Sequence, residues 1–188
     1  MAFFTSVREK RLWALVLIVT VTIFSTLFIG RPLQNMLSDQ NIQAIFFSLG
    51  LLLVGVTILS YGFQKSPVSA AEISIWIGLV AVYLMLFLRL GLPERSHLIE
   101  YSVLAIFLHL ALVERQPESY KTWKTALLAF SITTGIGVLD EVIQIFLPHR
   151  VFDPNDIVFN SMAAVMAIGA SLLLRLARTK VKQKRANK

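Results

Sequence analysis

Residues 133–164 read TTGIGVLDEVIQIFLPHRVFDPNDIVFNSMAA, and this stretch indicates a membrane protein built from packed helices. Two apolar runs are joined by a short polar connection, residues 148–155. The first run carries Asp140, Glu141 and Gln144 although it is hydrophobic enough to lie in a membrane. An ionisable side chain at the centre of a membrane helix costs about 2.5 to 3.5 kcal/mol, so such groups normally face a bundle interior and mark a functional site. We therefore expect the rest of the chain to build that interior.

The composition places the chain among membrane proteins. Of its 188 residues, 56% are hydrophobic and only 15% are charged, and the mean hydropathy is +0.70. Soluble domains usually contain about 25% charged residues. Cysteine is absent, which excludes disulfides, a thiol nucleophile and a cysteine-based metal site. We expect one membrane domain over residues 1–188.

Six apolar runs have about the length of a membrane span, which needs about 17 to 25 residues. They cover residues 12–29, 42–62, 73–92, 98–113, 126–147 and 157–174. We interpret the first run as an anchor rather than a signal peptide, because no small-residue cleavage site ends it and more spans follow. The fourth run is short, and a second interpretation is that its helix continues through Arg115. The sequence thus predicts an all-α bundle of about six transmembrane helices.

The basic residues predict the orientation of the bundle. With both termini in the cytoplasm, 14 of the 18 Lys and Arg residues lie on the cytoplasmic side, as the positive-inside rule requires. The loops at 92–98 and 148–156 then open to the non-cytoplasmic side. Residues 175–188 carry seven basic residues and no acid, so we expect a disordered cytoplasmic tail near anionic lipid headgroups. Because no aromatic interleaving accompanies this run, we expect no nucleic-acid binding.

Three of the predicted helices carry polar stripes that end at the same membrane level. At 100° per residue, neighbouring turns place these side chains on one face of each helix. The stripes are His97, Glu100, Tyr101, Leu104 and Leu108 in the fourth run, Thr133, Gly137, Asp140, Glu141 and Gln144 in the fifth, and Asp156, Asn160, Ala163, Ala167 and Ser171 in the sixth. Small residues let helix backbones approach closely in lipid, so we expect the three stripes to face one another.

The order of these polar positions carries a resemblance to a known family. The chain has Pro93-Glu94-Arg95-Ser96-His97-Leu98-Ile99-Glu100-Tyr101, and later Asp140-Glu141-x-x-Gln144-x-Phe146-x-Pro148-x-Arg150-x-x-Asp153-x-x-Asp156-x-x-x-Asn160. This pattern resembles the VanZ-like family of small bacterial membrane proteins, over about half of the chain. It departs where Ala163 and Ala164 replace a frequent Gly, and where His149 replaces a Gly of some members.

The family takes its name from an accessory teicoplanin-resistance protein. The resemblance therefore implies an accessory role in glycopeptide tolerance or envelope homeostasis, and a multi-pass location in the bacterial cytoplasmic (inner) membrane. It carries over no catalytic roles, because the biochemical activity of the family is not settled. The roles that follow are our own interpretation of the residues.

Anion binding on the non-cytoplasmic side is the first function that these residues indicate. Arg150 offers a planar fork for a carboxylate or a phosphate. The partners that we expect are membrane lipids, with an anionic headgroup or a lipid-linked cell-wall precursor as the ligand. The candidate ligand-binding residues are Arg150, Gln144, Glu100, Tyr101, Arg95, Asp156 and Asn160.

Catalysis is the second function, with Glu141, Asp140 and His97 as candidate catalytic residues. Two adjacent acids in an apolar setting suit general-acid chemistry, and the histidine is a possible proton partner. A membrane-embedded hydrolase or transferase on a lipid-linked substrate therefore stays open, although no Ser-His-Asp arrangement or phosphate-cradling loop indicates a known enzyme class. A transporter stays open as well. So does a structural subunit in which Arg150 pairs with Asp153 or Asp156, Gln144 and Asn160 bond to backbone carbonyls, and the network only fixes helix packing.

A metal site is a further alternative. His97 and Glu100 lie one turn apart, and Asp140, Glu141 or Asp156 would complete a carboxylate-rich set that suits Mn or Mg better than Zn. Because no recognised metal signature is present, we assign no metal and no cofactor.

Several neighbouring residues are expected to have structural roles. Asp156 is expected to cap the last predicted helix. His109, Tyr83 and Arg89 are expected to be packing residues or anchors at the membrane interface.

Overall fold

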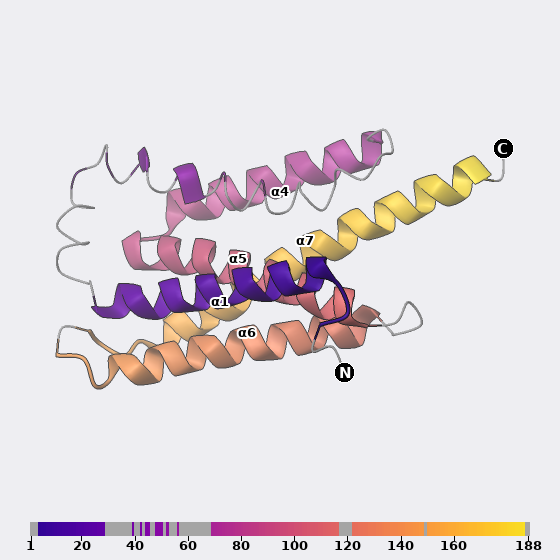
Figure 1. The fold of residues 1–188 in the computed structure, drawn as a ribbon. Coiled ribbons are helices and arrows are strands. Elements are labelled where there is room, and N and C mark those ends of the chain that lie inside the picture. The colour runs from indigo at the N-terminus through magenta and orange to yellow at the C-terminus, as the bar shows by residue number, and fades with distance from the viewer. Residues whose placement is uncertain are drawn as a thin grey trace.

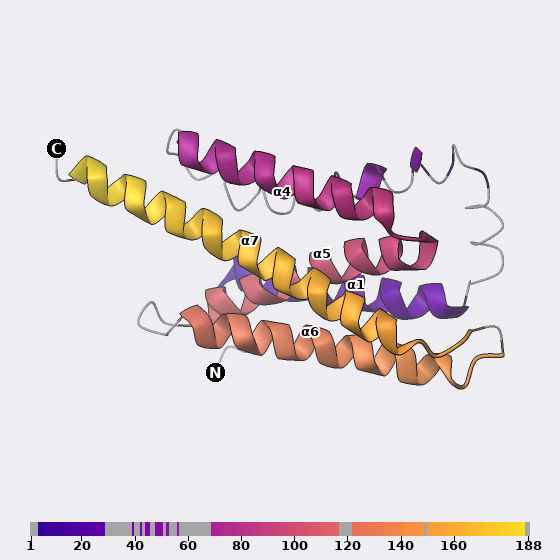
Figure 2. The same ribbon diagram turned by 180° about the vertical axis from the view of Figure 1, so that it is seen from behind.

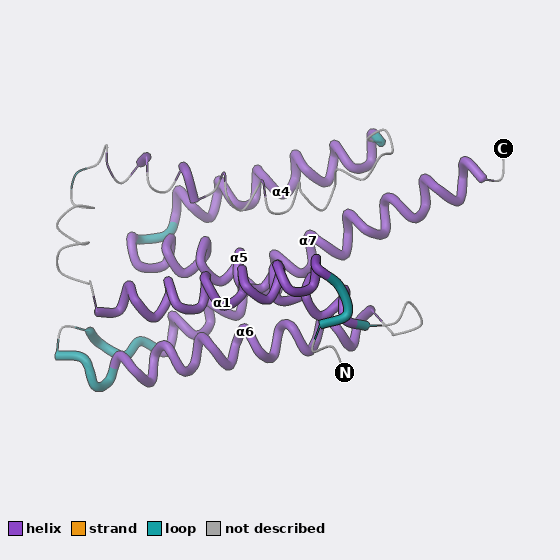
Figure 3. Tube along the Cα trace, in the orientation of Figure 1, coloured by secondary structure: helices purple, strands orange, loops and turns teal. Residues whose placement is uncertain are grey.

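A computed structural model shows that the protein is an all-α membrane bundle (Figure 1). The structure describes residues 4–28, 69–116, 122–148 and 150–186, with positions 39, 42, 44, 45, 48–50, 52 and 56. The helices are α1 (Val7–Phe28), α4 (Ala70–Arg89), α5 (Leu92–Arg115), α6 (Thr122–Gln144) and α7 (Pro154–Ala186). These described parts contain helices and loops and no strand (Figure 3), so the predicted fold class is confirmed.

Helix α5 forms the centre of the bundle. It packs against α1, α6 and α7. In its apolar 18-residue window 72% of the residues are buried, against 22%, 33% and 44% in α1, α6 and α7. Helix α7 crosses the bundle diagonally and also contacts α4 and α6 (Figure 2). A polar residue on the inner face of α5 is therefore enclosed by helices rather than by lipid.

The outer surface of the bundle is apolar. Leu17 and Ile18 on α1, and Ile77 and Leu88 on α4, are between 59% and 69% exposed. Helices α1, α5, α6 and α7 are long and apolar enough to cross a membrane, and α4 contains a shorter apolar section, Ala70–Leu86. Such a surface fits lipid, since acyl chains are as apolar as these side chains. The predicted span at 42–62 lies largely outside the described residues.

Two boundaries differ from the sequence prediction. Helix α5 begins at Leu92 and ends at Arg115, so the predicted loop at 92–98 is already helical. Its first turn contains Pro93, which is favoured there because the fixed φ suits a helix and the missing N–H has no partner to lose. Helix α7 continues to Ala186, where the sequence predicted a disordered tail. The Arg, Lys, Gln and Ala residues of this segment are strong helix formers, which explains the continuation.

The start of α1 and the end of α7 lie at the same end of the bundle (Figure 1), which we call the end that holds the termini. Ion pairs join helices at this end. The pairs are Arg8 Nη1 with Glu114 Oε2 at 3.4 Å, Arg115 Nε with Glu9 Oε1 at 4.0 Å and Arg178 Nη2 with Glu72 Oε2 at 3.3 Å. The opposite end holds the start of α5, the end of α6 and the start of α7. The segments that the sequence assigned to one membrane side thus share one end of the fold.

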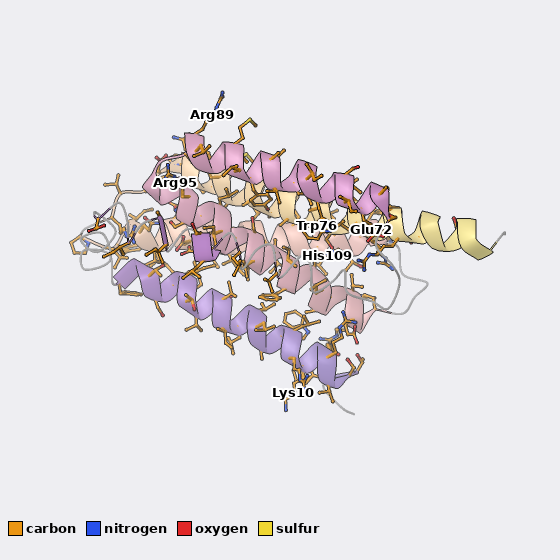
Figure 4. The ribbon with its side chains drawn as sticks, turned by 90° about the horizontal axis from the view of Figure 1, so that it is seen from above. Lys10, Glu72, Trp76, Arg89, Arg95 and His109 are labelled. Carbon is orange, nitrogen blue, oxygen red and sulfur yellow. The ribbon has the colours of Figure 1, made fainter. Side chains whose placement is uncertain are left out.

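Three residues outside the polar stripes can now be placed. Tyr83 is only 5% exposed, and its hydroxyl lies 3.0 Å from Ser102 Oγ, so the predicted interface anchor is instead a core residue. Arg89 is exposed and points away from the bundle (Figure 4). His109 is buried inside the bundle, with Nδ1 3.5 Å from Ser171 Oγ, as expected of a packing histidine.

Candidate functional site

The polar stripes of three helices meet at the end of the bundle opposite the termini. The first turns of α5 and α7 and the last turns of α6 lie together there, and the three helices contact one another (Figures 1 and 2). The candidate site residues that are buried at this end are His97, Tyr101, Asp140, Glu141, Gln144 and Asn160. The structure thus brings together residues that lie up to 63 positions apart between His97 and Asn160.

Glu141 is fully buried, and both of its carboxylate oxygens accept hydrogen bonds. Gln144 Nε2, one turn later on α6, donates to Oε1 at 2.9 Å. The backbone N–H of Asp153 donates to Oε2 at 3.2 Å. These two bonds connect the last turn of α6 to the loop before α7, and they hold the carboxylate in a defined orientation.

Asp140, the neighbouring acid, accepts a hydrogen bond from a residue of α5. The Tyr101 hydroxyl donates to Asp140 Oδ2 at 3.1 Å. The other oxygen, Oδ1, is buried and has no hydrogen-bond partner among the described residues. Asp140 therefore keeps an acceptor available inside the bundle.

His97 connects α5 to α7. Its Nε2 lies 3.5 Å from Asp156 Oδ2, and its ring centroid lies 5.9 Å from that of Tyr101. His97 is 8% exposed, so the imidazole is largely buried rather than on the surface. The Nδ1 atom has no hydrogen-bond partner in the described part of the chain.

The start of α7 differs from the prediction that Asp156 caps it. Helix α7 begins at Pro154, and the capping contact comes from Asp153, whose Oδ1 accepts a hydrogen bond from the Asn155 N–H at 2.9 Å. Proline is favoured at a first helical position and Asp at the residue before it. Because Asp153 takes this role, the carboxylate of Asp156 is left to face His97.

Gly137 on α6 lies in close contact with both α5 and α7. A Cβ atom at this position would lie 3.0 Å from Asn160 Nδ2, 3.1 Å from Asn160 Cβ and 3.3 Å from Tyr101 Cε1. Contacts this short are tighter than ordinary van der Waals packing, so a larger residue requires Asn160 and Tyr101 to shift by a few tenths of an ångström. The sequence marked Gly137 as a small stripe residue but did not predict its partners.

Asn160 lies one helical turn after Asp156 on α7 and is fully buried. Neither the nitrogen nor the oxygen of its side-chain amide has a hydrogen-bond partner among the described residues. Most buried polar groups in proteins are hydrogen-bonded, and exceptions call for an explanation. The structural interpretation had predicted that Gln144 and Asn160 bond to backbone carbonyls. The described contacts differ, because Gln144 donates to Glu141 and Asn160 is left without a partner.

Arg150 stands in the loop between α6 and α7 and reaches α1. Its Nη2 donates to the backbone carbonyl of Thr26 at 3.2 Å. Among the described residues it makes no ion pair, so the predicted pairing with Asp153 or Asp156 is wrong. A carbonyl bond satisfies only one of the five N–H donors of a guanidinium, and the fork is left open to an anion.

The two remaining candidates lie at the edge of this site. Glu100 is half-buried one turn after His97, and its carboxylate makes no hydrogen bond to another described residue. Arg95 Nε donates to the Leu90 carbonyl at 2.9 Å. Because Arg95 precedes His97 by two residues, about 200° around a helix, it projects from the opposite face of α5. Arg95 and Arg89 mark the same end of the bundle, away from Lys10 and Glu72 (Figure 4).

Three of these side chains are also of the types that bind metal ions. One ligand atom from each of His97, Glu141 and Asp156 lies within 4.8 Å of the other two. This set differs from the one that the sequence suggested, since it omits Glu100 and Asp140.

The family comparison agrees with this architecture. A family model described as VanZ/LLP1 matches residues 12–175, which is most of the chain and includes every residue of the site. No curated protein and no solved structure matches the chain.

Proposed function

This chain belongs to the VanZ/LLP1 family, and on that premise we propose that its polar end binds an anionic envelope lipid or a lipid-linked cell-wall precursor. The observation that carries the proposal is the state of Arg150. Its guanidinium is half-buried, bonds a single backbone carbonyl and forms no ion pair with a described acid. An Arg fork in this state is suited to bidentate contact with a phosphate or a carboxylate.

The distribution of charge supports a position of this site on the non-cytoplasmic side. The end of the bundle that holds both termini also holds Arg8, Lys10, Arg11, Arg115, Lys124, Arg175 and Arg178. Positive residues flanking membrane spans favour the cytoplasm. In a bacterial inner membrane that the chain crosses several times, the opposite end, with Arg150, then faces the outer leaflet.

We assign the protein an accessory role in glycopeptide tolerance or envelope homeostasis. A protein that holds an anionic lipid or precursor at the outer leaflet changes the local supply of the molecules on which glycopeptides act. This role follows from the proposed ligand, and it requires no chemical reaction at the site.

A second candidate function is hydrolysis or group transfer on a lipid-linked substrate. It is favoured by one observation: His97 Nε2 lies 3.5 Å from Asp156 Oδ2 beside the buried carboxylate of Glu141. A histidine oriented by one carboxylate near a second acid is an arrangement used for proton transfer. Turnover of a labelled lipid-linked substrate by the purified protein distinguishes this function from binding.

The binding proposal is tested with purified protein in nanodiscs or detergent. We expect native mass spectrometry to show tighter binding of phosphatidylglycerol or undecaprenyl phosphate than of phosphatidylcholine. Comparing the first two lipids distinguishes a phospholipid headgroup from a polyprenyl carrier. Arg150→Lys keeps the charge but loses the fork, and should weaken binding by about 10-fold or more, because hydrogen bonds to charged groups contribute about 1.5 to 3 kcal/mol.

Arg89→Lys is the matched control, since Arg89 lies at the same end of the bundle but points away from it. It should bind anionic lipid like the wild type. Equal affinity of the wild type for phosphatidylcholine and phosphatidylglycerol would overturn the proposal, and so would unchanged binding by Arg150→Lys.

A further inference from the structure

The strongest feature that lipid binding alone does not explain is the convergence of His97, Glu141 and Asp156. Their ligand atoms come from three different helices, α5, α6 and α7, and lie within 4.8 Å of one another. We infer that these three side chains form a binding site for a divalent cation of the Mn²⁺ class at the headgroup end of the bundle. The site holds the cation on one imidazole nitrogen and two carboxylates.

The distances fit such a site. Nitrogen and oxygen ligands lie about 2.0 to 2.2 Å from a first-row divalent ion such as Zn²⁺. Two ligands of one ion are therefore about 3 Å apart at right angles and about 4.2 Å apart when they are opposite. The distance of 3.5 Å between His97 Nε2 and Asp156 Oδ2 falls inside this range. The largest separation among the three ligand atoms is at most 4.8 Å, and a small side-chain rotation would bring it into the range.

The groups around the trio give an independent indication of a ligand. Asn160 lies one helical turn below Asp156 on the same face of α7, is 0% exposed, and both of its amide atoms lack a partner among the described residues. Asp140 Oδ1, on the residue next to Glu141, is also buried and has no hydrogen-bond partner among the described residues. Buried polar atoms without protein partners commonly mark the place of an ordered ion, a water or a ligand.

The charge at this end of the bundle also favours a bound cation. Among the side chains that the structure describes, five acids lie at this end, namely Glu100, Asp140, Glu141, Asp153 and Asp156. Arg150 bonds to α1 instead of to any described acid. Burying carboxylates without compensation is costly in an apolar environment. The donor set of one imidazole and two carboxylates suits Mn²⁺ better than the thiolate-preferring ions, and no cysteine is present.

The same cation explains how an anion approaches an acidic cluster. Three protein ligands leave coordination positions open on the ion, and an open position accepts a phosphate oxygen. The ion and the Arg150 fork then hold the headgroup from two sides. This bridging step rests on the proposed function, whereas binding of the cation does not.

The test uses Mn²⁺ alone on chelator-stripped, full-length protein, with the electron paramagnetic resonance signal of free Mn²⁺ as the readout. We expect the wild type to bind one Mn²⁺ per chain and to unfold at a higher temperature in its presence. His97→Gln, Glu141→Gln and Asp156→Asn should each weaken binding by about 10-fold or more, as the loss of groups at a metal site does. Controls are His109→Gln on the same helix and Glu114→Gln at the opposite end, both expected to bind Mn²⁺ like the wild type.

Folding of each variant is checked by its unfolding transition without metal. Where His97→Gln fails to fold, Asp156→Asn carries the test, because its side chain is 14% exposed. Absence of Mn²⁺ binding by the folded wild type overturns the site. Wild-type affinity in a folded His97→Gln or Asp156→Asn variant overturns it as well.

The bridging step is measured separately with phosphatidylglycerol, with Mn²⁺ or with EDTA. We expect binding at least about 5-fold tighter with Mn²⁺, which is the lower range of coupling between two sites. If Mn²⁺ binds but lipid affinity is the same in EDTA and still depends on Arg150, bridging is overturned and the proposed function stands. If Mn²⁺ binds and no anionic lipid binds under either condition, the proposed function fails and the cation site stands.

Discussion

Gly137→Ala tests the claim that close approach of three helices builds the site. The new methyl group would lie 3.1 Å from Asn160 Cβ and 3.3 Å from Tyr101 Cε1. Asn160 Cβ is fixed to the α7 backbone and cannot rotate away, and the Tyr101 ring is held by its hydroxyl bond to Asp140. Relief of the contact therefore requires the backbones of α6 and α7 to move apart by a few tenths of an ångström.

Two opposing effects set the magnitude. Overpacking of a tight core usually costs about 1 to 3 kcal/mol. Replacement of Gly by Ala inside a helix stabilises it by about 1 kcal/mol. The net change for Gly137→Ala is thus a loss of about 0 to 2 kcal/mol in the free energy of unfolding, which alone is a weak signal.

Gly135→Ala provides the comparison that isolates the packing effect. A Cβ atom at Gly135 meets nothing within 4 Å, and this residue lies on the same helix two positions earlier. Gly135→Ala gains helix propensity without creating a close contact, so the free energies of unfolding of the two variants should differ by about 1 to 3 kcal/mol. Equilibrium unfolding in mixed micelles, followed by circular dichroism and the fluorescence of the three Trp residues, measures both. Equal stability of the two variants would refute the argument that Gly137 is required for helix approach.

Three further predictions follow from the same geometry. Tyr101→Phe removes the hydroxyl that donates to Asp140 and should lower the free energy of unfolding by about 1 to 3 kcal/mol, whereas unchanged unfolding would show that this bond is unimportant. A reporter after Lys188 should be cytoplasmic and a tag at His149 accessible from outside, and finding both on one side would end the proposed topology. Glu141→Gln should insert and accumulate normally yet lose glycopeptide tolerance, because an amide keeps the size but neither ligates a cation nor titrates; full tolerance at normal abundance would leave Glu141 a structural role only.

The faces of the helices were predictable from the sequence because they depend only on the 3.6-residue period. Tyr101, Asp140 and Asn160 lie on predicted stripes, and all three are buried in the structure. The period says which residues share a face, but it says nothing about how far one helix slides along another. The close contact of Gly137 with Asn160 and Tyr101 depends on that register, and it was not predictable from one helix at a time.

Local chemistry explains two other differences. An Asp followed by Pro is a signal for a helix cap and a first helical residue, and it would have identified Asp153 as the cap in place of Asp156. The contact of Arg150 with Thr26 joins residues 124 positions apart and has no local signal. The expectation that Arg150 pairs with a nearby acid relied on sequence proximity, and the contact of Arg150 with the last turn of α1 overrides it.

The two ends of the bundle allow the structural and functional interpretations to be weighed against each other. At the end that holds the termini, Glu9 and Glu72 are buried and satisfied, the first by Thr5 and Trp13 and the second by Arg178. At the opposite end Asn160, Asp140 Oδ1 and His97 Nδ1 are buried without partners in the described chain. His109 Nε2, Thr133 Oγ1 and Thr134 Oγ1 are in the same state elsewhere in the bundle, but the unpartnered carboxylate and amide atoms among the described residues all lie at this opposite end. Each unsatisfied polar group costs about 1 to 3 kcal/mol, and apolar residues of similar volume would pack the same space at lower cost. A network kept only for helix packing should resemble the first end, so the unsatisfied groups of the second end are better explained by a ligand that completes them.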